Sequence, residues 1–230
     1  MTGRRILLGA RCFADAEPAI PIAVDLAIRT GAALHGIFAE DRAMLDPCGT
    51  MATLVSPNGE RLTFDRGAME RACLGDARAF ERALARVAGA ARVDWTFASG
   101  RGSIPALLQR AARQGDLLLH GYRSPFPARD RIIVVTDGTE GTEALIRLSV
   151  AMAEGTGKPL HVIVTGGQYP AALDPASGAS VETVDTLEAT CDALQRRSPV
   201  TVVVALAPEA RAALAALADA SRTTLISVAP

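Results

Sequence analysis

Residues 5–40 of this 230-residue chain recur, without a gap, as residues 131–166. The constant offset of 126 positions gives eleven identities over thirty-six positions, among them Thr30-Gly31 with Thr156-Gly157 and Leu34-His35 with Leu160-His161. Chance agreement over such a stretch would be far lower, so the repeat indicates two copies of one structural module. We place the two domains at residues 1–128 and 129–230, which are ordinary lengths for a domain.

The second copy indicates what kind of module this is. Residues 132–135 are apolar and β-branched throughout, as in a strand buried on both faces of a parallel sheet. A segment with helical spacing of apolar residues follows and ends at Gly155 and Gly157, and residues 160–164 form a second apolar run. A strand, a helix and a returning strand of this length make a right-handed crossover with parallel strands. The sequence therefore predicts an α/β fold of two tandem, Rossmann-like parallel-sheet units with flanking helices, related by a pseudo-twofold axis and not merged into one sheet of a single order.

Each copy is expected to hold four strands and three helices. The expected strands are residues 4–10, 34–38, 93–98 and 116–120, and then 132–135, 160–164, 200–206 and 223–228; in the second copy, residues 181–197 and 208–220 are expected to be helical. Residues 41–67 form a long irregular passage that is rich in apolar side chains. We expect it to fold back as a flap over the carboxyl end of the first sheet or to meet a partner protein, the alternative being a linker.

Composition excludes several classes of partner. The net charge of −1 and the pI near 6.3 provide no field that would attract nucleic acid or an anionic membrane. The sequence holds neither an apolar run long enough to span a bilayer nor a signal-peptide core, so we expect a soluble, cytoplasmic protein. The four cysteines form no Cys-x-x-Cys pair and are interpreted as reduced thiols.

Three stretches together carry a family resemblance: RILLGA with PIAVDLAIRTGAALHGIFAED, ASGRGSIPALLQRAARQGDLLLHG, and RIIVVTDGTEGTEALIRLSVAMAEGTGKPLHVIVTG. Over nearly its whole length the chain resembles the universal stress protein family in its tandem two-domain form. The resemblance implies a parallel sheet flanked by helices. In nucleotide-binding members it also implies ATP held by an aspartate after the first strand and by a glycine signature after the fourth.

That nucleotide site carries over only in part. Asp137 matches the family aspartate in the second copy, but Arg11 stands at this position in the first. Gly121 follows the fourth strand of the first copy, and three residues later Ser124 replaces the next glycine of the signature. Only Ala229 and Pro230 follow the last strand, so we expect no phosphate loop in the second copy and no fifth strand in either. Without glycines the backbone cannot approach phosphate closely, so we predict that ATP binds no tighter than about millimolar.

Three short segments are candidates for ligand contact. One ends a strand of an open α/β sheet, where ligands of such folds bind. Another opens a helix, whose N–H groups could hold an anion or simply be capped. The third contains an aspartate that either contacts a ligand or bonds to N–H groups of its own turn. The candidate binding residues are Asp137, Gly138, Thr139, His120, Gly121, Arg123, Gly100 and Gly102.

Other chemistry has little support in the sequence. His35 and His161 recur at one repeat position, and we interpret them as strand histidines hydrogen-bonded near a sheet edge, not as metal ligands. Residues 134–139 resemble the phosphatase motif of the haloacid dehalogenase superfamily, but its nucleophilic aspartate would fall at Val135. An aspartyl-phosphate cannot form there. We therefore expect no catalytic residues and no metal.

These observations favour a non-catalytic, universal-stress-protein-like protein with degenerate nucleotide sites, which acts in stress through ligand sensing or protein contact. No cofactor is expected. The alternative is a universal stress protein that binds ATP or AMP through the Asp137 and Gly121 regions. The expected partner is a protein or a small ligand, without nucleic acid or membrane, and the chain would be a pseudo-dimeric monomer or a homodimer.

Overall fold

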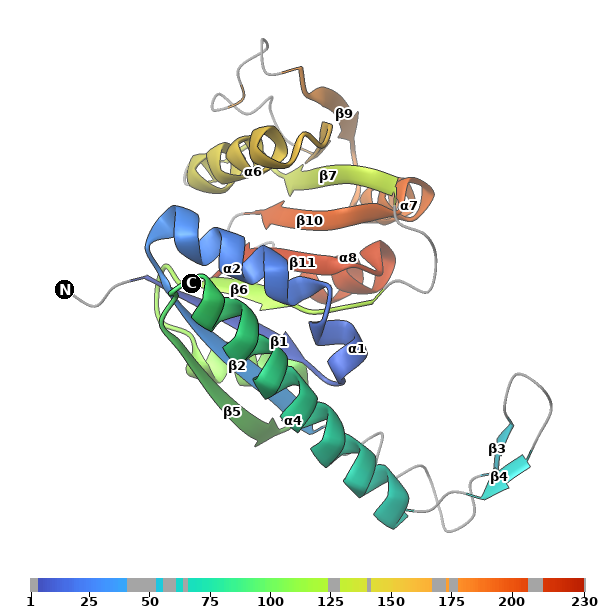
Figure 1. The fold of residues 1–230 in the computed structure, drawn as a ribbon. Coiled ribbons are helices and arrows are strands. Elements are labelled where there is room, and N and C mark those ends of the chain that lie inside the picture. Colours follow the sequence, from blue (N-terminus) through green and yellow to red (C-terminus); the bar gives the residue numbers. More distant parts are fainter. Residues whose placement is uncertain are drawn as a thin grey trace.

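Nine of the described strands form one continuous sheet that runs through both halves of the chain (Figure 1). This computed structural model describes residues 4–40, 53–55, 61–63, 66–123, 129–139, 142–166, 173, 178–206 and 213–229. Across the sheet the strands follow the order β5-β2-β1-β6-β11-β10-β7-β8-β9. Neighbouring strands are parallel except β6 and β11, which are antiparallel.

The two halves contribute similar but not identical successions of strands and helices. The first half contains β1 (Arg5–Ala10), α1 (Phe13–Ala16), α2 (Ala19–Thr30), β2 (Ala33–Glu40), α4 (Arg66–Ala90), β5 (Trp95–Arg101), α5 (Ile104–Ala111) and β6 (Leu117–His120). The second contains β7 (Arg129–Thr136), α6 (Glu143–Thr156), β8 (Leu160–Thr165), β9 (Ser180–Val184), α7 (Leu187–Arg197), β10 (Pro199–Ala205), α8 (Leu214–Ser221) and β11 (Thr224–Val228). The predicted α/β fold with a largely parallel sheet and flanking helices is confirmed.

The glycine pair at the constant offset has a direct structural role. Gly31 ends α2 at φ 63°, and Gly157 ends α6 at φ 66°. Their N–H groups donate to the carbonyl oxygens of Ala27 and Ala153, which are themselves 126 residues apart. A left-handed residue at this point turns the chain out of the helix and into the next strand, and glycine adopts that conformation without a Cβ clash.

The junction between the halves differs from our expectation of separate sheets. Ile226 of β11 pairs with Leu119 of β6, and Val228 pairs with Leu117. Counted inward from the two outer edges, the strands follow corresponding orders, β5-β2-β1-β6 in the first half and β9-β8-β7-β10 in the second, with β11 as the extra strand between them. The sheet therefore does not run in a single order. The superposition of the halves and the domain boundary at residue 128 remain predictions.

Two further expectations about the second half were wrong. Residues 181–184, which we expected to begin a helix, belong to the edge strand β9 (Ser180–Val184) beside β8. The fourth strand of this half is therefore β10, and β11 is the fifth strand that we expected to be missing. The connection that could carry a phosphate loop follows β10, and residues 206–220 contain no glycine.

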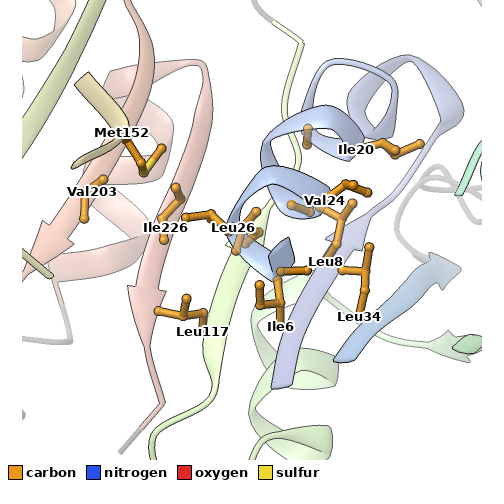
Figure 2. Packing of buried hydrophobic residues seen from close by; sticks show 14 of the residues in the cluster. Ile6, Leu8, Ile20, Val24, Leu26, Leu34, Leu117, Met152, Val203 and Ile226 are labelled. Carbon is orange, nitrogen blue, oxygen red and sulfur yellow. The ribbon is translucent and has the colours of Figure 1, made fainter. Parts of the chain in front are cut away.

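The core is continuous on only one face of the sheet. On the face covered by α2, α4 and α6, a single cluster crosses the junction, with Leu26 of α2 near Leu117 and Ile226, and with Val203 and Met152 beyond them (Figure 2). On the face covered by α5, α7 and α8 the buried side chains form two clusters, one in the second half and one made of first-half residues together with Ala229. This interruption of the core lies where the candidate site is found.

The passage between β2 and α4 is described only in part. Strands β3 (Thr53–Val55) and β4 (Arg61–Thr63) form an antiparallel hairpin, and Figure 1 places it out from the sheet, near the amino end of α4. The hairpin does not cover the carboxyl ends of the strands. The other residues of 41–67 that carry the flap prediction lie outside the described residues, so that prediction is untested. None of the described helices has the length and apolar content that crossing a membrane requires.

Candidate functional site

A cavity of about 220 Å³ opens on the interrupted face, between α5 of the first half and α8 of the second. It lies at the carboxyl ends of β1, β2 and β6 and at the amino end of β11, because β6 and β11 are antiparallel. Its lining comes from both halves: Arg11, Ala39, His120, Gly121 and Tyr122 after the strands, Ser103, Ile104 and Pro105 from α5, and Ala218, Asp219 and Thr223 from the second half.

The connection after β6 explains why this space is open. In the second half, α8 follows the fourth strand and covers the sheet. In the first half only the eight residues 121–128 separate β6 from β7, which is too short a connection for a comparable crossover helix. The sheet between α5 and α8 is therefore less well covered than the opposite face.

His120 lines the cavity at the end of β6. It is largely buried, and this burial lowers the pKa of its imidazole to about 4. The ring is consequently neutral at pH 7, with one nitrogen able to donate and the other able to accept a hydrogen bond. Within the described part of the chain it makes no hydrogen bond, so both nitrogens are available to a ligand.

The residues after His120 are hydrogen-bonded to the carboxylate of Asp15, which was not among the candidate residues predicted from the sequence. Asp15 is 7% exposed, and its Oδ1 accepts a hydrogen bond of 3.0 Å from the backbone N–H of Arg123. Its Oδ2 accepts one of 3.3 Å from Nε of Arg11. The N–H of Gly121 donates to the carbonyl of Gly9 at 2.8 Å, and a Cβ on Gly121 would lie 2.8 Å from the backbone oxygen of Asp15. Gly121 is required for this tight packing.

The segment before α5 shapes one wall of the cavity. Gly102 has φ 130°, and its N–H donates to the carbonyl of Glu40. A Cβ on Gly100 would lie 2.7 Å from a side-chain carbon of Leu107. These two glycines position the helix. Its N-cap residue, Ser103, lines the cavity, and the Ser103 hydroxyl makes no capping hydrogen bond.

The second predicted group lies elsewhere. Asp137, Gly138 and Thr139 follow β7. Because β7 runs antiparallel to β6, the carboxyl ends of these two strands point in opposite directions. Oδ1 of Asp137 accepts hydrogen bonds from the N–H of Thr139 at 3.1 Å and from its hydroxyl at 2.7 Å. Asp137 therefore bonds within its own turn, and the candidate residues do not form one site.

The repeated histidines hold the outer strands together. Nδ1 of His35 lies 2.5 Å from the hydroxyl of Thr96, and Nδ1 of His161 lies 2.7 Å from that of Ser180. Burial lowers the pKa of both imidazoles. These are the hydrogen-bonded strand histidines that the sequence predicted. The described residues contain no group of three metal-ligating side chains.

No family model and no curated protein matches the sequence. Solved structures do match the fold. A universal stress protein from Archaeoglobus fulgidus DSM 4304 aligns with a TM-score of 0.54 and 11% identity, over 98% of this chain and 96% of that one. A functionally unknown protein from Pseudomonas aeruginosa PAO1 aligns at 0.49 with 13% identity, over 99% and 92%. The universal stress protein from Archaeoglobus fulgidus in complex with dAMP aligns at 0.32 with 13% identity, over 44% and 99%. The first of these alignments shows that the chain has the fold of a universal stress protein over nearly its whole length.

Proposed function

We propose that the protein is a non-catalytic sensor of the universal stress type, with degenerate nucleotide sites, which acts in the cytoplasm by binding a small ligand or a partner protein. One observation carries this proposal: the loop after β6 is closed onto the carboxylate of Asp15. The N–H of Arg123, which a phosphate could otherwise use, already donates to that carboxylate. A phosphate brought to this loop would also meet a buried negative charge.

The second half supports the same conclusion. The carboxylate of Asp137 accepts hydrogen bonds from the N–H and the hydroxyl of Thr139. The connection after β10 contains no glycine, which would let the backbone approach phosphate oxygens closely. Among the residues that the structure describes, neither half presents the complete set of groups that the family resemblance implies for ATP.

The cavity also favours binding over catalysis. Ser103, His120 and Asp219 all line it, but no hydrogen bond joins any two of them in the described part of the chain. A nucleophile needs a base within hydrogen-bonding reach to be activated. Burial raises the pKa of the nearby Cys12 to about 11, so that its thiol stays protonated at neutral pH.

Thermal shift with nucleotides tests the proposal. With ATP and Mg²⁺ at about 1 mM, a Kd of about 1 mM stabilises the protein by only about 0.4 kcal/mol, a rise in Tm of about 1–2 °C for a chain of this size. A Kd of about 1 µM would give about 4 kcal/mol and a rise of roughly 8–16 °C. We expect the small response for ATP, ADP and AMP; the large one would establish the nucleotide-binding alternative.

A pair of variants tests the role of the carboxylate. Asp15→Asn keeps the side-chain shape but removes the charge, and it should raise the response to ATP above that of the wild type. Asp25→Asn removes a carboxylate from the exposed side of α2 and should change nothing. If Asp15→Asn responds like the wild type, Asp15 is not what weakens nucleotide binding.

A further inference from the structure

We propose that the cavity between α5 and α8 binds a small zwitterion, namely a free amino acid with an apolar side chain. This inference rests on the proposed ligand-sensing function and gives the class of ligand. It follows from opposite polarity at the two ends of the cavity, from its apolar walls, and from its size.

The wall from the first half presents hydrogen-bond donors, and the charge of its Arg11 is partly offset by Asp15. The amino end of α5 lines the cavity with Ser103, Ile104 and Pro105; Pro105 has no N–H, but the backbone N–H groups of Ser103 and Ile104 have no partner within the helix. Because the Ser103 hydroxyl does not cap the helix, it leaves them available to a ligand. The guanidinium of Arg11 lines the same wall and uses only Nε for Asp15, so its remaining N–H groups can donate to a carboxylate.

The wall from the second half is electronegative. Asp219 lies in the last turn of α8 and is among the residues that line the cavity. This is the carboxyl end of the helix, where unpaired carbonyl groups and the helix dipole favour a cation. An ammonium group is the complement of this wall, just as a carboxylate is the complement of the other.

Between these ends the walls are mostly apolar. Ala39, Ile104, Pro105 and Ala218 face the space, and the neutral His120 adds one donor and one acceptor without a charge. The volume of about 220 Å³ exceeds the roughly 150 Å³ of an engineered apolar cavity that binds benzene in another protein, but it is below the range typical of drug-sized ligands. A molecule of about ten heavy atoms with an apolar body therefore fits.

Calorimetry with three matched compounds tests the inference: leucine, 4-methylpentanoate, which lacks the ammonium group, and 3-methylbutylamine, which lacks the carboxylate. We expect leucine to bind with a Kd below about 1 mM and each analogue to bind at least about tenfold more weakly. Asp219→Asn should weaken leucine at least about tenfold and leave 4-methylpentanoate unchanged. The matched control is Asp192→Asn, on the exposed side of α7 and outside the cavity lining, which should leave all affinities unchanged.

The chain has three histidines, and NMR of their ring signals shows where leucine binds. Leucine should shift the ring signals of His120 and leave those of His35 unchanged, since His35 is hydrogen-bonded on β2, outside the cavity lining. Absence of saturable binding up to about 10 mM, equal affinity for 4-methylpentanoate, or full leucine binding by Asp219→Asn would each overturn the inference. None of these results bears on nucleotide binding. The proposed function is tested separately, by the ATP measurement.

Discussion

Replacing Asp116 by asparagine should destabilise the protein strongly, because this buried carboxylate joins β1 to the segment between α5 and β6. The side chain is 4% exposed. Its Oδ1 accepts a hydrogen bond from the N–H of Arg5 at 3.1 Å, and its Oδ2 accepts one from the Arg5 guanidinium at 2.6 Å and one from the N–H of Arg113 at 2.8 Å.

The magnitude follows from these three bonds to one charge. Each hydrogen bond to a charged group contributes about 1.5–3 kcal/mol, but water reaches the Arg5 side chain, which is 24% exposed, and reduces the loss. We expect a loss of about 3 kcal/mol in the free energy of unfolding at pH 7, near the lower end of values for broken buried ion pairs. For this chain length it corresponds to a fall in Tm of about 6–12 °C.

The pH dependence gives an independent check. Burial alone would raise the pKa of Asp116, but the hydrogen bonds from Arg5 and Arg113 outweigh it and lower the pKa below the ordinary carboxyl value. A group with a lowered folded-state pKa stabilises fully above its unfolded pKa, and this contribution is lost as the pH falls through the folded pKa. The difference between wild type and Asp116→Asn should therefore be constant above about pH 5 and shrink below about pH 4.

Urea unfolding followed by circular dichroism measures both effects. Asp25→Asn, which breaks an exposed pair with Arg29 on α2, is the control and should leave the midpoint close to that of the wild type. A loss below about 0.5 kcal/mol for Asp116→Asn, or a difference that does not change between pH 5 and pH 3, would refute the reasoning.

Three further outcomes are expected from single sites. Leu26→Ala removes a fully buried side chain at the junction of the halves and should cost about 2.5–5 kcal/mol in urea unfolding, whereas Ile28→Ala, 59% exposed on the same helix, should cost less than about 0.5 kcal/mol. Gly121→Ala should lower Tm because its Cβ would meet a backbone oxygen at 2.8 Å, whereas Gly75→Ala on α4, with open space around it, should raise it slightly. In an NMR titration His120 should stay neutral from pH 8 to pH 5 and titrate near pH 4, and a value between 6 and 7 would show that its ring is not buried.

The sequence predicted those parts of the fold that depend on local patterns. The apolar runs of β1, β2, β7 and β8 and the helix-ending glycines Gly31 and Gly157 are short-range signals, and their repetition at a fixed offset made each copy support the other. Strand β9 was missed because residues 181–197 contain neither glycine nor proline to mark its end. A signal was present in Thr186, whose hydroxyl accepts from the N–H of Ala189 and so caps the start of α7.

The site was harder to predict because it depends on contacts between distant residues. His120 and Gly121 were identified from their place at a strand end, but the facing wall, with Ala218 and Asp219, comes from the other half. That wall reaches His120 only because β11 pairs with β6, and this pairing followed from a fifth strand that we did not expect. Asp15 lies in a short helix outside the repeat identities, and nothing in its local sequence indicates that it accepts from Arg123.

The central claim is that the site at the carboxyl ends of β1 and β6 does not hold a nucleotide. Titration calorimetry of the wild-type protein with ATP and Mg²⁺ at neutral pH tests it most directly. Because the Asp15 carboxylate already accepts from the N–H of Arg123, the measured Kd should be about 1 mM or weaker. This corresponds to a binding free energy of about −4 kcal/mol or less favourable. A saturable isotherm with a micromolar Kd would contradict the account.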